Sequence, residues 1–163
     1  YLSTITYNLI EGATRVIIFC AYIILISRYN KEIKRVWQYH GAEHKTIHCY
    51  ESGQDLTVEN ASKFSTIHPS CGTSFMINVM IISILVFSLI GRYSLLINII
   101  LRFLLIPVIA GVSYEVLKLS RKFKSVIIDI INKPGMMLQK YTTAEPDDKQ
   151  LEVAIIALKE SLK

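Results

Sequence analysis

Residues 75–91 contain no charged side chain and are rich in methionine, isoleucine and valine. Residues 95–117 form a second apolar run, in which Arg102 and Glu115 are the charged residues. About 20 apolar residues in a helix are enough to cross the roughly 30 Å hydrocarbon core of a bilayer. Because lipid offers no hydrogen-bond partners, such runs restrict the chain to helices that satisfy their own backbone groups.

A third apolar run occupies residues 9–27, near the start of the chain. It includes Glu11 and Arg15, whose spacing allows them to pair on one helix face. Hydrophobic residues make up 52% of the chain and its mean hydropathy is +0.39, which indicates that lipid is part of its solvent. We therefore expect an all-α, polytopic membrane protein with about three transmembrane helices plus amphipathic cytoplasmic or interfacial helices.

Basic residues follow the first and third apolar runs and predict the topology. They are Arg28, Lys31, Lys34 and Arg35 in the first group, and Lys118, Arg121, Lys122 and Lys124 in the second. If residues 92–94 make a hairpin, both groups lie on the same side, which the positive-inside rule assigns to the cytoplasm. The expected location is the bacterial inner membrane, with the histidine-rich region and the C-terminus in the cytoplasm. The net charge of +5 is thereby explained, and no nucleic-acid partner is expected.

These patterns divide the chain into a first transmembrane helix (1–28), a cytoplasmic histidine-rich region (29–73), a transmembrane hairpin (74–119) and cytoplasmic amphipathic helices (120–163). Within these regions we expect a helix over 31–51, a short helix within 55–65 capped by Thr57, and an amphipathic segment over 125–138 broken at Pro134 and Gly135. Asp147 and Gln150 have the spacing of a capping box for a last helix. The chain opens at Tyr1 without an initiator methionine, and we expect it to be the later part of a longer protein.

All four histidines lie between positions 40 and 68, and three of them fall in the run YHGAEHKTIHCYE at 39–51. Since helical residues advance by about 100°, His40, Glu43, His44 and His48 share one side of a helix. Two imidazoles four residues apart can bind one cation, and H-x-x-E-H is the arrangement of inverted zinc peptidases. The predicted catalytic residue is Glu43, as general base, and the predicted metal ligands are His40, His44, His48, His68 and Cys71.

His68 and Cys71 belong to a second cluster, HPSC, at residues 68–71. The alternative for this cluster is a turn with a buried thiol. Glu59 and Glu115 are further candidate ligands, with a solvated first-turn carboxylate and an interfacial side chain as their alternatives. The alternative for the whole motif is a helix whose histidines bond lipid headgroups, Glu51 and Glu59. The three cysteines form no disulfide framework, so a reducing compartment is expected.

The segments at 39–51, 56–60 (LTVEN), 68–75 (HPSCGTSF) and 145–148 (EPDD) resemble the YqhQ-like family of bacterial integral membrane proteins. The resemblance covers essentially the whole chain and matches the later portion of the family, without its opening region rich in glycine and methionine. It implies a metal-dependent membrane protein but no particular reaction, since the family is functionally uncharacterised. The family usually has a basic residue where this chain has Ser70, so a contact of that charge with an anionic ligand would be missing here.

The leading expectation is a membrane-embedded metal-binding protein, a zinc-type hydrolase acting at the cytoplasmic membrane face on a substrate that the sequence does not name. The cofactor is a divalent metal ion, zinc first, with iron or manganese as alternatives because two histidines and a carboxylate also form the iron facial triad. The second hypothesis is a non-catalytic oligomeric scaffold, channel or transporter component with a structural metal site. Ala110, Gly111 and Ser113 allow close helix packing, so a homo-oligomer in the lipid bilayer is expected.

Overall fold

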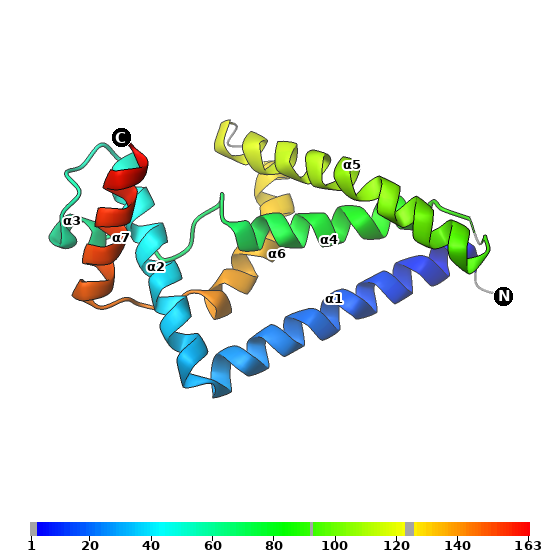
Figure 1. Cartoon of the computed structure of the whole chain (residues 1–163), viewed down its shortest axis with the longest axis horizontal. Helices are drawn as coiled ribbons and strands as arrows, with labels where there is room; N and C mark the ends of the chain where they lie inside the picture. Colours follow the sequence, from blue (N-terminus) through cyan, green and yellow to red (C-terminus); the bar gives the residue numbers. More distant parts are fainter. Residues whose placement is uncertain (1–2, 92, 123–125) are drawn as a thin grey trace. The chain divides into compact units, whose positions relative to one another are not determined.

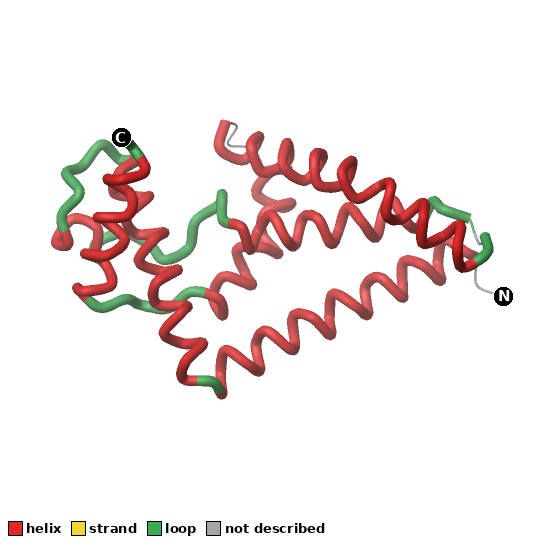
Figure 2. Tube along the Cα trace, in the orientation of Figure 1, coloured by secondary structure: helices red, strands yellow, loops and turns green. Residues whose placement is uncertain are grey.

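The computed structural model describes residues 3–91, 93–122 and 126–163. Within these ranges the chain forms helices and loops without a strand, as Figure 2 shows, and the expected all-α class is confirmed. The helices, labelled in Figure 1, are α1 (Thr4–Tyr29), α2 (Lys31–Glu51), α3 (Val58–Ser62), α4 (Gly72–Ser88), α5 (Leu95–Lys122), α6 (Val126–Thr142) and α7 (Asp148–Ser161). The predicted hairpin at Arg92 and the cation at Lys124 lie outside the described residues.

The chain divides into two compact units. Unit 1 contains Tyr1–Tyr22 and Pro69–Gly135, and unit 2 contains Ile23–His68 and Met136–Lys163. The boundaries fall within α1 and α6 and directly after His68. All four histidines therefore belong to unit 2.

Two helices are long and apolar enough to cross a membrane. They are Thr4–Tyr29 and Leu95–Leu119, with mean hydropathies of 2.1 and 2.5 in their most apolar windows. None of the first window and 6% of the second is buried within the protein, so their apolar side chains are available to lipid. The third expected span is a helix, α4, but it has 17 residues and rises only about 25 Å. The structure thus supports a membrane protein through two such helices instead of the three expected.

Charged side chains meet within unit 1. Glu11 and Arg15 form the predicted ion pair on α1. The guanidinium carbon of Arg102 lies 5.4 Å from the centre of the Phe87 ring, so α5 directs a cation against α4. All four residues line a cavity of about 180 Å³. Arg102, a charged residue within the apolar run of α5, therefore faces the packed helices of unit 1.

The expected break at Pro134 is wrong, because α6 continues through it to Thr142. Proline removes one backbone donor from a helix and usually bends or ends it. Here close packing accompanies the continuous helix: a β-carbon added at Gly135 would lie 2.6 Å from the α-carbon of Ser74. Tertiary contact with the first turn of α4 therefore outweighs the local signal of the Pro-Gly pair.

Unit 2 is built on α2, against which α3 and α7 pack (Figure 1). Helix α2 begins after Asn30, whose side chain accepts hydrogen bonds from two first-turn N–H groups, and ends before Gly53, which has a φ of 72°. The predicted bounds of this helix are confirmed. The buried core of unit 2 is formed by Ala42 and Cys49 from α2, Ala61 from α3, and Leu151 and Ile155 from α7.

The two predicted helix caps of this unit are also confirmed. The side chain of Thr57 accepts a hydrogen bond from the Asn60 N–H at the start of α3. Asp147 and Gln150 form both bonds of a capping box at the start of α7. These caps define where α3 and α7 begin.

Candidate metal centre

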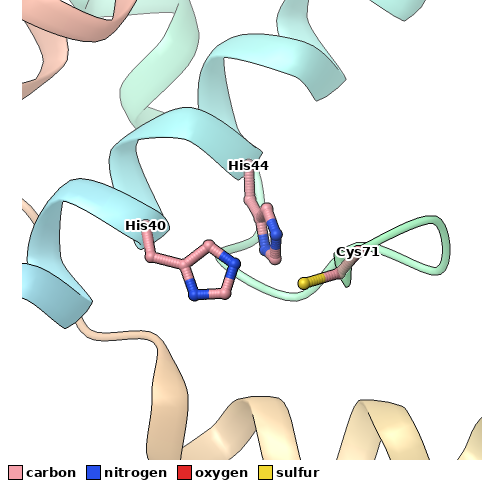
Figure 3. A group of neighbouring side chains, drawn as sticks. All are labelled: His40, His44 and Cys71. Atoms are coloured by element: carbon pink, nitrogen blue, oxygen red, sulfur yellow. The ribbon is translucent and has the colours of Figure 1, made fainter. Parts of the chain in front are cut away.

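The first pair of candidate ligands comes from consecutive turns of α2. His40 and His44 project from the same side of the helix, as Figure 3 shows. Their ring centres lie 4.4 Å apart in an edge-to-face arrangement. Four residues advance a helix by slightly more than one turn, so this pairing follows directly from the sequence spacing.

Backbone carbonyls orient both of these imidazoles. Nδ1 of His40 lies 2.6 Å from the Thr142 carbonyl oxygen, and Nδ1 of His44 lies 2.6 Å from the Thr66 carbonyl oxygen. Because a carbonyl can only accept, each Nδ1 carries a hydrogen, and in the neutral form of each ring the lone pair is then on Nε2. Metal-binding histidines typically donate their second nitrogen in this way, which fixes the tautomer and the ring orientation.

The second pair is formed by His48, one further turn along α2, and His68, at the end of the loop after α3. Their ring centres lie 4.5 Å apart. Nε2 of His48 lies 3.0 Å from the Ile67 carbonyl oxygen, and Nε2 of His68 lies 3.0 Å from Oε2 of Glu51. One ligand atom from each of His48, Glu51 and His68 falls within 4.8 Å of the others.

Burial controls the protonation of His68. Its side chain is 3% exposed, and burial lowers its pKa from the ordinary value of 6.5, because water no longer stabilises the imidazolium. The hydrogen bond and negative charge of Glu51 act in the opposite direction, while His48 and His44 add to the lowering. A pKa below 6.5 leaves His68 neutral at pH 7, which is the form that binds metals.

Gln139, on α6, holds the backbone of His68. Its Oε1 accepts the His68 N–H and its Nε2 donates to the His68 carbonyl, both at 2.9 Å. The side chain of Gln139 is fully buried. The sequence interpretation missed this residue, since it lies just beyond the predicted amphipathic segment and 71 residues from its partner. The feature of the sequence that could have indicated a buried Gln139 is its position directly after three apolar residues at 136–138.

The segment after α6 lies against the middle of α2. The Ala144 N–H donates to the Trp37 carbonyl at 2.9 Å. A β-carbon added at Gly41 would lie 2.1 Å from the Ala144 carbonyl oxygen, so only glycine permits this approach. Lys45, nearly buried, donates to the Ser62 carbonyl at 2.8 Å and pairs with Glu145 at 2.6 Å. The contacts place the Thr142 carbonyl beside His40.

The carboxylates predicted as a general base or as further ligands are not grouped with the histidines. Glu43 is exposed and lines a groove with Val153 and Ala157 of α7, so the structure does not gather it with the imidazoles. Glu59 pairs with Lys63. In unit 1, Glu115 pairs with Lys118.

Cys71, labelled in Figure 3, belongs to unit 1, where it is buried and its sulfur accepts the Thr73 N–H at the start of α4. It follows His68 by three residues, so their α-carbons are at most about 11 Å apart. The roles predicted for Glu43 and Cys71 stay predictions.

Comparison with known proteins supports the resemblance seen in the motifs. Residues 1–163 match the family described as "Protein of unknown function (DUF1385)". The chain belongs to this family. One DUF1385 relative is "Uncharacterized protein YqhQ" of Bacillus subtilis (strain 168), 42% identical over 155 residues, which cover 94% of this chain and 48% of the relative. The chain thus spans about half the length of that relative. No solved structure matches.

Proposed function

We propose that this DUF1385 chain is a membrane-embedded metalloprotein that holds a divalent ion at the histidines of unit 2 and works as a zinc-type hydrolase at the cytoplasmic membrane face. The observation that carries the proposal is the pair of carbonyl bonds to Nδ1 of His40 and His44, which directs the Nε2 lone pairs to be the ligands. The remaining predicted ligands, His48, His68 and Cys71, are the candidates for further metal coordination.

The donor set fits a transition-metal ion. Imidazoles, with a cysteine three residues beyond the last of them, match the nitrogen and sulfur ligands that zinc prefers. Oxygen-rich sets favour magnesium, calcium or manganese, and only one carboxylate, Glu51, is grouped with these imidazoles among the described residues. Zinc is therefore the first choice over manganese, and iron is the next alternative.

The hydrolytic part of the proposal rests on the chemistry of an open site. When bound with a vacant coordination position, such an ion supplies Lewis-acid activation of water. The chain's own contribution is to orient the imidazoles through the carbonyls of Thr142 and Thr66. Two carboxylates of α2 are candidates for moving a proton: Glu43, predicted as general base, and Glu51, which is hydrogen-bonded to His68.

The membrane location is part of the same proposal. We place the protein in the inner membrane of a bacterium, with α4 as a third span and with α2, α3 and α7 in the cytoplasm. The support is the basic group at the end of α1 and the start of α2, namely Arg28, Lys31, Lys34 and Arg35, together with the positive-inside rule. Reporter fusions at the C-terminus test it: a reporter active only outside the cytoplasm must stay inactive, and its activity would refute this topology.

Metal content is the decisive measurement. The purified protein, loaded with zinc and freed of excess, is analysed by mass spectrometry beside His44→Ala and the control Tyr50→Phe, an exposed residue of the same helix. We expect bound zinc in the native protein and the control, and loss of zinc at this position in His44→Ala. Zinc content that His44→Ala leaves unchanged would remove His44 from the site.

The coordination shell separates the two functional classes. X-ray absorption at the zinc edge counts nitrogen, oxygen and sulfur ligands. Three protein ligands with water in the fourth position support a hydrolase, whereas four protein ligands support the structural site of a scaffold, channel or transporter component.

A further inference from the structure

The four histidine rings of unit 2 form a row. Ring centres are separated by 4.4 Å between His40 and His44, 5.8 Å between His44 and His68, and 4.5 Å between His68 and His48. The row thus contains two close pairs joined by a longer step. Each close pair includes rings that a backbone carbonyl or Glu51 orients through one nitrogen.

A single ion cannot use the whole row. Zinc–nitrogen bonds of about 2.0–2.1 Å keep any two ligand atoms of one shell within roughly 4.2 Å of each other. His40 and His48 are eight residues apart on one helix, which separates their α-carbons by about 12 Å along the axis. At that separation both rings would have to extend along the helix axis toward each other to reach one ion, whereas His40 pairs with the His44 ring and His48 with the His68 ring.

The pair formed by His48 and His68 has a carboxylate of its own. Nε2 of His68 and Oε2 of Glu51 lie 3.0 Å apart, close to the roughly 3.4 Å edge of a tetrahedral zinc shell with bonds of about 2.05 Å. A cation can therefore take the place of the hydrogen between these two atoms if the distance between them increases only slightly. His48 donates its Nε2 hydrogen to the Ile67 carbonyl, which leaves Nδ1 as its ligand atom.

We propose that the histidine row holds two divalent ions, the second bound by His48, Glu51 and His68. The first is the ion of the proposed function, at His40 and His44, and the two-ion arrangement rests on that function. Two imidazoles and one carboxylate are the ligand set of catalytic zinc sites and also suit iron. Binding of the second ion through Nε2 of the neutral His68 ring requires the ring hydrogen to lie on Nδ1 instead of Nε2. Paired ions are a common arrangement for hydrolysis of phosphate esters and peptides, which names the substrate classes to be tested.

Stoichiometric titration tests the second ion. The full chain in detergent is stripped of metal and titrated with zinc against a chromophoric chelator, beside His44→Ala, His48→Ala and Glu51→Gln. We expect two equivalents of zinc in the native protein and one in each of the variants. Glu51→Gln keeps a polar side chain of nearly the same shape, so it is informative even where His48→Ala fails to fold. Tyr50→Phe is the control and must bind two equivalents.

The other outcomes separate the two proposals. One equivalent in the native protein, lost in His44→Ala but kept in His48→Ala and Glu51→Gln, overturns the second ion and leaves the proposed function in place. One equivalent that is lost in His48→Ala but kept in His44→Ala overturns the two-ion arrangement and moves the single site away from His40 and His44. No bound zinc overturns both.

Discussion

The side-chain amide of Gln139 bonds both the N–H and the carbonyl of His68, each at 2.9 Å. One buried side chain thereby satisfies the two backbone groups of a candidate ligand whose flanking residues are in a loop. A buried N–H or carbonyl that loses its partner costs about 1–3 kcal/mol. The orientation of His68 thus depends on α6, although the ring itself faces α2.

Replacing this amide is expected to weaken both folding and metal binding. Gln139→Ala removes the two bonds and should lower the free energy of unfolding by about 2–4 kcal/mol. Zinc affinity should fall as well, because His68 is no longer held. Thermal unfolding and zinc titration measure the two effects, with Lys140→Ala, an exposed neighbour, as control. Equal behaviour of the two variants would contradict the role assigned to Gln139.

Gly41→Ala is expected to destabilise unit 2 even though alanine favours helices by about 1 kcal/mol. The added β-carbon would meet the Ala144 carbonyl oxygen at 2.1 Å, and backbone cannot move aside as a flexible side chain does. We expect a net loss of about 1–3 kcal/mol, measured by thermal unfolding. Gly111→Ala is the comparison, since nothing lies within 4 Å of its added β-carbon, and it should be neutral or stabilising.

Lys45 and Lys63 allow the ion pair of a buried lysine to be compared with that of an exposed one. Lys45→Met keeps the aliphatic stem but leaves the Ser62 carbonyl without this donor and Glu145 without its cation, so we expect a loss of about 1–3 kcal/mol. Lys63→Met removes an exposed pair with Glu59 and should change stability by less than about 1 kcal/mol. Chemical unfolding of the two variants measures the difference, and an equal effect would contradict it.

Acid is expected to destabilise the metal-free protein through His68. Its pKa in the folded protein lies below the unfolded value of 6.5, so between these two values the unfolded chain binds more protons. This contribution to stability is complete above pH 6.5 and is lost as the pH falls toward the folded pKa. Thermal unfolding at pH 7.5 and pH 5.5 should give the lower midpoint at pH 5.5. The variant His68→Gln should show a smaller difference between the two midpoints. If the difference is the same as in the native protein, groups other than His68 cause the loss of stability in acid.

Cys71 is predicted to supply sulfur to the zinc shell. Cys71→Ser should abolish a zinc–sulfur distance of about 2.3 Å in X-ray absorption spectra. Cys20→Ser, at a cysteine of α1, should leave the spectrum unchanged. A native spectrum without a sulfur shell would exclude Cys71 as a ligand and favour a shell of imidazole and carboxylate.

Local signals in the sequence predicted most of the helices. The bounds of α2 and the caps at Thr57 and Asp147 depend on neighbouring residues, and all were predicted correctly. Pro134 was misread because the packing of Gly135 on Ser74 is a contact between distant segments. The shared side of His40, His44 and His48 followed from helical geometry. The angular spacing of residues on a helix does not show, however, which residues at the edge of that side contact another helix. Glu43 accordingly lies in the groove toward α7.

The hydrogen bond between His40 and the Thr142 carbonyl joins residues 102 positions apart. On the ribosome, the histidines are therefore made long before the carbonyl that orients the first of them and before Gln139, which holds the last. Helices α4 and α5 are synthesised in the interval. The nascent chain therefore lacks the carbonyl that orients His40 and the amide that holds His68 until residues 139–144 emerge, so the row of imidazoles reaches its final geometry late in the synthesis of this protein.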